Sequence, residues 1–152
     1  MTKAANPSMT DDQIIEAAMK IQLRRLKREG SITDPMIAGD YMSSRLAHLE
    51  HEEFHVMLLD TRHRIIECKM LFRGTIDGCE VHPREVIKYA LSKGAAAIIA
   101  AHNHPSGDAS PSASDRAVTN RLRDAAQLMD IRLLDHLIVG EHVISLASRG
   151  WL

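Results

Sequence analysis

The chain of 152 residues has the length of one domain and can bury a core without help from disulfides or structural metals. Its 19 basic and 20 acidic side chains nearly cancel, which excludes a protein that binds polyanions over its whole surface but not a local basic patch. Aromatic residues make up only 3% of the chain, which disfavours base-stacking platforms for single-stranded nucleic acid. Nine histidines are an unexpected excess in so small and aromatic-poor a chain.

Cysteine usage and hydropathy indicate the compartment. Cys68 and Cys79 form no C-x-x-C pair, which is typical of a reducing cytoplasm rather than of a disulfide framework or a thiolate zinc site. The first residues contain no apolar core of a secretory signal, and no stretch approaches the roughly 18 apolar residues of a membrane span. We therefore expect a cytoplasmic protein without a membrane partner.

The N-terminal part of the chain predicts a disordered start and one amphipathic helix. Residues 1–9 are small and polar, and the helix is expected from Thr10 or Asp11 to about Glu29, where Gly30 ends it. Its apolar stripe, which could pair with a second copy in a homodimer, consists of Ile15, Met19, Leu23 and Leu26. Its last turns carry Lys20, Arg24, Arg25, Lys27 and Arg28. A solvated face that complements the helix dipole is the simpler interpretation, and a phosphate-binding edge for DNA is the alternative.

The remaining residues, 34–152, alternate strands and helices after an opening helix. We expect helices at 34–49, 83–92 and 112–129, and strands at 54–60, 65–73, 75–81, 95–101, 131–140 and 142–147. The first two strands form a hairpin around a tight turn at 61–64. The pattern predicts an α/β fold, a mixed β-sheet flanked by helices, as a unit distinct from residues 1–33. Ligand sites in such sheets lie beyond the carboxyl ends of strands, and His102 and His104 follow the most apolar strand.

The end of that strand carries the residues with the strongest chemical signal. His102 and His104 are two residues apart in an extended segment, so both imidazoles project to the same side. The next helix opens with Ser112 and Asp115 at capping-box spacing, which by itself favours a simple helix cap. Asp115 also begins a stripe that we expect to face the core, continuing through Val118, Leu122, Ala125 and Met129. An unpaired carboxylate there would be costly to bury, and a metal ion shared with both histidines would remove that cost.

These residues carry a family resemblance. The segment HNHPSG followed by PS and then Asp115 resembles the JAMM signature of MPN (JAB) metalloproteases, and most closely the RadC-like branch. The stretches EEFHVMLLD, LFRGT, HPREVIKYAL, LLDHLIVG and SLASRGWL resemble the same branch in order and spacing. The resemblance covers Asp34–Leu152 and does not include the family's N-terminal helix-hairpin-helix domain. It implies a JAB/MPN, cytidine-deaminase-like architecture.

The resemblance also implies a set of site residues. Zn²⁺ would be held by His102, His104 and Asp115 with water in the fourth position, the arrangement of a catalytic zinc site. The family's general base is a Glu at the start of an early strand; Glu52 aligns with it, and Glu50 and Glu53 are the alternatives. Ser112 would donate a hydrogen bond to the oxyanion. Asp135 and His136 are candidates for the groups that orient a ligand imidazole from outside.

The other histidines near the first strand, His48, His51, His55 and His63, share no ligand spacing, and we interpret them as surface or hydrogen-bonded residues. Two functions follow. The first is a zinc-dependent hydrolase acting on a peptide, an isopeptide or a ubiquitin-like conjugate. The second is a non-catalytic, RadC-like interaction module associated with DNA in repair or mobile-element biology. A zinc nucleobase deaminase is disfavoured because the chain has no C-x-x-C.

Overall fold

The computed structural model describes residues 8–28 and 35–152, and the side chains of residues 26–28 and 35 are not described. The predicted disorder of residues 1–7, the predicted helix end at Glu29 and Gly30, and the side chains of Lys27 and Arg28 lie outside this description. In chain order the elements are α1 (Asp11–Arg28), α2 (Pro35–Leu46), β1 (Glu53–Leu59), β2 (Ile65–Arg73), α3 (Pro83–Ser92), β3 (Ala97–Asn103), α4 (Ala113–Leu128), β4 (Arg132–Val139) and β5 (Val143–Ser145). None of the described helices is long and apolar enough to cross a bilayer.

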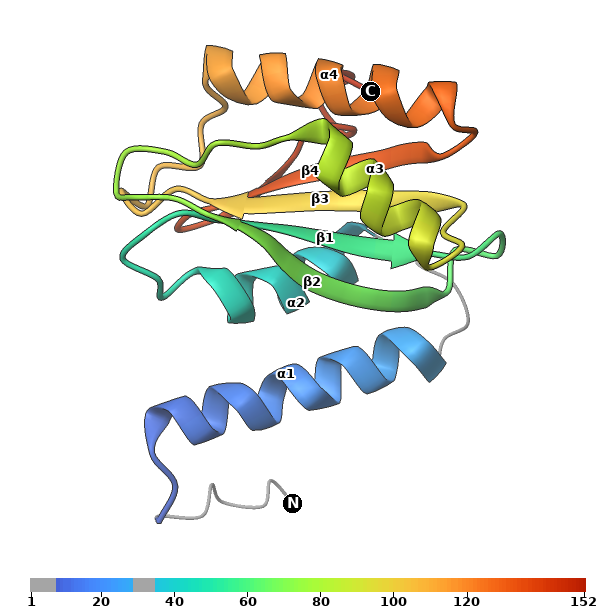
Figure 1. The fold of residues 1–152 in the computed structure, drawn as a ribbon. Helices are drawn as coiled ribbons and strands as arrows, with labels where there is room; N and C mark the ends of the chain where they lie inside the picture. The colour runs from blue at the N-terminus through green and yellow to red at the C-terminus, as the bar shows by residue number, and fades with distance from the viewer. Residues whose placement is uncertain (1–7, 29–34) are drawn as a thin grey trace.

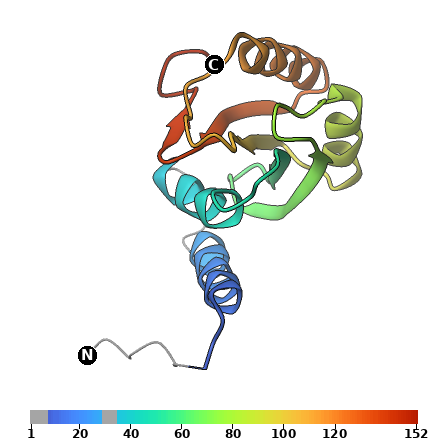
Figure 2. The same ribbon diagram turned by 90° about the vertical axis from the view of Figure 1, so that its left-hand side faces the viewer.

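The five strands form one mixed sheet in the order β2-β1-β3-β4-β5. Strand β1 runs antiparallel to both β2 and β3, and β3 runs parallel to β4. Helices α3 and α4 cover one face of the sheet, and α2 covers the other, with α1 beyond it (Figures 1 and 2). This is the mixed sheet flanked by helices that the strand and helix pattern predicts, and every residue of the central strand β3 is buried.

Two apolar clusters hold the layers together. One lies between α2 and the sheet, with Met42 and Leu46 packed against Met57 and Ile99, and Met19 of α1 lies against its edge. The other lies between the opposite face and the helices α3 and α4. Because β3 contributes apolar side chains to both clusters, its carboxyl end is held from both faces of the sheet.

The expected strand at 75–81 is wrong, because this segment is a loop between β2 and α3. The backbone turns back on itself here: the Thr75 amide donates to the Gly78 carbonyl at 2.8 Å. The loop does pair locally with the residue before β1, since the Glu52 amide donates to Thr75 and the Gly74 amide donates to Glu52, both at 2.8 Å. The predicted strand is therefore a turn, and its close backbone approach requires glycine at position 74, where a Cβ atom would lie 2.0 Å from the Gly78 oxygen.

The expected core stripe of α4 is correct in part. Leu122 is fully buried, whereas Met129 at the C-terminal cap is 50% exposed and does not face the core. The buried positions of this helix are Thr119, Leu122 and Ala126, so the buried stripe is rotated away from Met129. Asp115 lies one turn before Thr119 and so remains at the inner edge of the helix.

Candidate metal centre

The candidate site lies where the carboxyl end of β3, the residue before β1 and the first turn of α4 meet. His102 is the second-last residue of β3, and His104 follows the strand, with its amide bound to the Val139 carbonyl at 2.9 Å. Because β1 runs antiparallel to β3, with Phe54 opposite His102, the start of β1 lies beside the end of β3. The topology thus brings Glu52 to His102 and His104, which lie 50 and 52 residues further along the chain.

Three side chains converge here, and each imidazole is paired to a different oxygen of the Asp115 carboxylate. His102 Nε2 lies 3.1 Å from His104 Nε2 and 3.0 Å from Asp115 Oδ1, and His104 Nε2 lies 3.1 Å from Asp115 Oδ2. A tetrahedral zinc ion with bonds of about 2.0–2.1 Å separates neighbouring ligand atoms by about 3.3 Å. Two imidazole nitrogens and one carboxylate at this spacing are therefore a donor set that could hold a divalent metal ion such as zinc.

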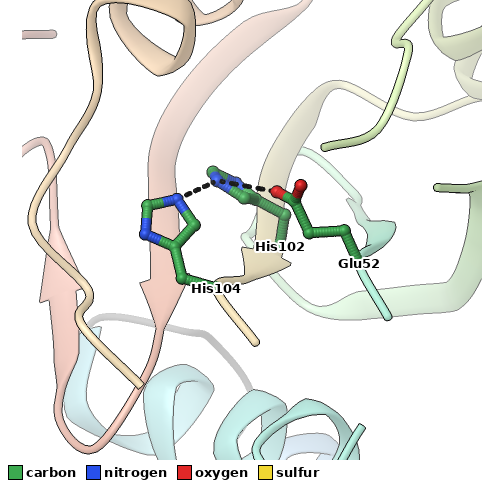
Figure 3. Close-up of side chains that lie close together, drawn as sticks. All are labelled: Glu52, His102 and His104. Carbon is green, nitrogen blue, oxygen red and sulfur yellow. Dashed lines mark hydrogen bonds and ion pairs between the residues drawn. The ribbon is translucent and has the colours of Figure 1, made fainter. Parts of the chain in front are cut away.

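Glu52 is the fourth titratable side chain at this point, as Figure 3 shows for its approach to His102. Glu52, His102 and His104 offer donor atoms within 4.8 Å of one another, so this group could also hold a metal ion. Glu52 Oε1 is nevertheless 3.9 Å from His102 Nε2, farther than either Asp115 oxygen is from its histidine partner. Asp115 therefore lies closer to His102 than Glu52 does, and both carboxylates lie beside the two histidines.

Asp115 is both a helix cap and part of this cluster. Its amide donates to Ser112 Oγ at 3.0 Å, and the Ser112 amide donates to Asp115 Oδ2 at 2.8 Å, which completes a capping box. Burial raises the pKa of Asp115, but hydrogen bonds from His102 and His104 outweigh burial and hold the pKa well below its usual range. The cap and the ligand role, weighed against each other from the sequence, are compatible in one side chain.

The far nitrogen of His104 is fixed by the loop that follows β3. Its Nδ1 lies 2.8 Å from the Asp108 carbonyl oxygen, which can only accept, so Nδ1 carries the hydrogen. In the neutral ring, the Nε2 lone pair then faces His102 and Asp115, as metal ligation requires. The hydrogen bond with Asp115 raises the pKa of His104, so protons compete with a metal for this nitrogen.

Glu52 is buried, at 8% exposure, and its backbone is held on both sides by the loop after β2. Burial raises the pKa of Glu52, and the neighbouring His102 and His104 oppose that shift. A carboxyl group with a raised pKa is suited to accept a proton and give it back near neutral pH.

The two alternatives to Glu52 lie elsewhere. Glu53 points to the other side of the strand, where its carboxylate binds His51 Nε2 at 2.9 Å and His55 Nε2 at 2.8 Å. Glu50 is exposed and lies outside the residues that line the cleft at the site. His55, only 2% exposed, is one of the hydrogen-bonded histidines that the sequence predicts.

His136 and Asp135, predicted together, have different surroundings. His136 is fully buried, and its Nε2 lies 2.8 Å from Nδ1 of His102. The Asp135 carboxylate instead accepts hydrogen bonds from the Ala147 amide at 3.0 Å and the Ser145 hydroxyl at 2.6 Å. Asp135 therefore ties the C-terminal segment to β4, and only His136 of this pair contacts a histidine of the cluster.

Thr119 contacts both His136 and the backbone of Asp115, and the sequence did not predict this position. Its hydroxyl lies 2.6 Å from His136 Nδ1 and donates to the Asp115 carbonyl at 2.7 Å. The available signal was its position four residues after Asp115 on the same side of a helix. Threonine at a core position gave no chemical pattern that would have singled it out.

A cleft of about 540 Å³ opens over the cluster. Ile76, Gly78 and Cys79 line one side of it, and Ser106, Ser112 and Ser114 are on its lining as well. Among the described residues that line it, the carboxylates are Glu52, Asp77 and Asp115, and none is a lysine or an arginine. The described side chains that line the cleft therefore include no permanent cation that could pair with phosphate groups.

The mixed sheet with paired histidines at the end of its central strand is consistent with the JAB class of domain. The RadC-like JAB domain family matches residues 32–151, and the chain belongs to this family. The division of the chain into residues 1–33 and 34–152 remains a prediction from the sequence.

Curated relatives carry the name UPF0758 protein, which states no activity. One from Vibrio cholerae serotype O1 is 49% identical over 142 residues, covering 93% of this chain and 90% of that protein. One from Xanthomonas oryzae pv. oryzae is 50% identical over 139 residues, and one from Pseudomonas fluorescens is 46% identical over 140 residues. Each of these two alignments covers 91% of this chain and 62% of the relative, so the chain spans less than two thirds of their length.

Proposed function

We propose that the protein is a zinc-dependent hydrolase of amide bonds, a JAMM-type peptidase or isopeptidase. The observation that carries the proposal is the convergence of His102, His104 and Asp115: the two Nε2 atoms lie 3.1 Å apart, and each lies 3.0–3.1 Å from one oxygen of the Asp115 carboxylate, with Glu52 beside them. Membership in the RadC-like JAB domain family supports the same chemistry.

In this proposal His102, His104 and Asp115 hold the metal. When bound, zinc supplies a Lewis acid that polarises a carbonyl group and lowers the pKa of water to about 7. Glu52 takes the proton of the attacking water and delivers it to the leaving amine, as its raised pKa allows. Ser112 accepts a hydrogen bond from the Asp115 amide, so its own hydroxyl hydrogen remains available to an oxyanion in the cleft.

The cleft favours a peptide, an isopeptide or a ubiquitin-like conjugate over a nucleic acid. Among the described residues that line it, no lysine or arginine is available to pair with phosphate groups, whereas a peptide backbone is neutral and needs no such partner. The exposed side chain of Ile76, 71% accessible at the edge of the cleft, offers an apolar contact to such a chain.

Metal analysis tests the proposal. Purified wild-type protein is expected to contain about one zinc per chain, because three side chains supply ligands. His104→Ala is expected to lose the metal, whereas His142→Ala, at an exposed position, is expected to keep it. Wild-type protein that remains free of zinc at a saturating concentration would contradict the proposal.

A DNA-associated module is the second candidate, favoured by three exposed cations on α1. Lys20, Arg24 and Arg25 are all exposed, although Lys20 already pairs with Glu16 at 3.1 Å. Figures 1 and 2 show α1 beyond α2, away from the face that carries α4. A duplex-DNA titration at several salt concentrations checks it: Arg24→Glu with Arg25→Glu should weaken binding and flatten its salt dependence. Unchanged binding in this double variant would reject α1 as the contact.

A further inference from the structure

A buried chain of hydrogen bonds connects the two elements that supply the candidate ligands. It runs from the Asp115 carbonyl on α4 through the Thr119 hydroxyl to Nδ1 of His136, at 2.7 Å and 2.6 Å. It continues from Nε2 of His136 to Nδ1 of His102 at 2.8 Å. Thr119 and His136 are both fully buried, so water does not replace these partners.

When His102 binds a metal, the groups at the two ends of this hydrogen-bond chain determine which atom donates and which accepts in each bond. The Asp115 carbonyl can only accept, so the Thr119 hydroxyl donates to it and presents a lone pair to His136. Nδ1 of His136 then donates to Thr119, which leaves the Nε2 lone pair of a neutral His136 free to accept. His102 donates to that lone pair from Nδ1, and its own Nε2 lone pair faces Asp115 and His104.

We infer that Thr119 and His136 are positioning residues that hold His102 in the tautomer able to ligate a metal. This inference rests on the proposed metal site and deepens it. His136 supplies the acceptor that a ligand imidazole needs at its second nitrogen, a role that a carboxylate or a carbonyl fills in many zinc sites. Thr119 is needed because neutral His136 accepts at Nε2 only while its hydrogen stays on Nδ1.

The opposite tautomer explains why the hydroxyl of Thr119 matters. Without it, the hydrogen on His136 Nδ1 would be buried without an acceptor, which is costly. The hydrogen would then favour Nε2 and donate to His102, which would carry its own hydrogen on Nε2, at the metal position. The same chain starts at the backbone of Asp115 and ends beside its carboxylate, so one arrangement orients ligands from both β3 and α4.

Nitrogen-15 NMR of the histidine rings in zinc-titrated wild-type protein tests the hydrogen positions directly. The expected spectrum shows His136 protonated on Nδ1 and unprotonated on Nε2, with the hydrogen of His102 on Nδ1. A hydrogen on Nε2 of His136 would overturn the inference. This measurement needs no variant in the chain, so it does not depend on how a substitution folds.

Zinc affinity, measured by competition with a chromophoric chelator, tests the role of the hydroxyl. Thr119→Val keeps the volume and removes the hydroxyl, and it should weaken zinc binding by about 10- to 100-fold. Thr119→Ser keeps the hydroxyl and is the matched control, with affinity expected close to wild type. Circular dichroism and thermal unfolding establish that both variants are folded.

The outcomes separate the two proposals. Wild-type protein that binds no zinc overturns the proposed function and, with it, the proposed role of Thr119 and His136 in metal ligation. Wild-type protein that binds zinc, with Thr119→Val binding equally well, overturns only the positioning role. Loss of affinity in Thr119→Val, with Thr119→Ser close to wild type, supports both.

Discussion

At the scale of single residues, the alternation of side chains along one strand separates two adjacent glutamates. Glu52 lies in the cleft beside His102, while Glu53 turns to the other side and binds His51 and His55. Their pKa values move in opposite directions: burial raises that of Glu52, whereas hydrogen bonds from His55 and His51 outweigh burial and lower that of Glu53. A shift of the backbone register by one residue would exchange these roles.

Glu52→Gln should keep the zinc and lower amide hydrolysis by about 10²- to 10⁴-fold, because it removes the proton acceptor but no proposed ligand. A panel of peptide and isopeptide substrates, assayed beside metal analysis, measures both properties. Glu53→Gln is the matched control and should retain most of the activity. Equal losses in the two variants would show that Glu52 is not the base.

His55 should make the protein less stable in mild acid. Burial lowers its pKa below the ordinary 6.5, so the unfolded chain binds this proton more readily than the folded protein does. The stabilisation is complete above about pH 6.5 and is lost as the pH falls from there toward the folded pKa. Urea unfolding from pH 7 to pH 5 should show a slope that His55→Gln reduces by at most about 1.4 kcal/mol per pH unit. His142→Gln, at an exposed position, should leave the slope unchanged.

At the scale of elements, the loop between β2 and α3 places Glu52. Gly74 and Thr75 hydrogen-bond both sides of the Glu52 backbone, and the loop closes through the Thr75 amide and the Gly78 carbonyl. A Cβ atom on Gly74 would lie 2.0 Å from the Gly78 oxygen, so the close crossing of the two backbone segments requires glycine. The loop is not a strand, and its hydrogen bonds hold the backbone of the proposed base.

Gly74→Ala should displace this loop and lower the hydrolytic activity while zinc remains bound, because the proposed ligands belong to β3, its following residues and α4. The overpacked crossing should cost about 1–3 kcal/mol of stability. Gly39→Ala, whose Cβ would meet Val143 at an ordinary 3.4 Å, is the control. Thermal unfolding, zinc content and activity of the two variants check the expectation. Loss of zinc in Gly74→Ala would show that the loop supports the ligands as well.

At the scale of the whole molecule, the site depends on three segments, with Glu52 lying 63 residues before Asp115 in the chain of 152 residues. The sheet order places β1 between β2 and β3. Helix α4 packs on the face of the sheet that α3 also covers, and this packing brings Asp115 to the end of β3. Zinc bound by His102, His104 and Asp115 would cross-link the end of β3 to α4 and stabilise only the folded state, since an unfolded chain does not hold these ligands together.

Removal of the metal should therefore lower stability. At a free zinc concentration of 100 times the Kd, binding adds about 2.7 kcal/mol, and a chelator should remove that increment from wild-type protein. Differential scanning calorimetry with and without chelator measures the change. His104→Ala should unfold at the same temperature in both conditions. A similar chelator effect on this variant would place the metal elsewhere.

Much of the fold was predictable because it depends on local patterns. Pro83 at its start and Gly94 beyond its end predicted the helix at α3, and the apolar run before His102 predicted β3. The tight turn after β1 followed from local polar residues, where Asp60 accepts hydrogen bonds from the amides of Arg62 and Arg64. The strand predicted at 75–81 was wrong because this segment forms a turn instead. That turn depends on backbone hydrogen bonds from Gly74 and Thr75 to Glu52, which lies far from them in the chain.

The sequence by itself determined the types and spacing of the candidate ligands, since His-x-His on a strand and Asp115 at a helix start are local features. Only the tertiary structure decided which partners complete the cluster. It placed Glu52 and Glu53 on opposite sides of the strand and bonded Asp135 to the C-terminal segment. It also placed His136 against His102, with Thr119 against His136. The physical reason is that these contacts depend on strand register and on how α4 packs, and both are set by burial across the whole sheet.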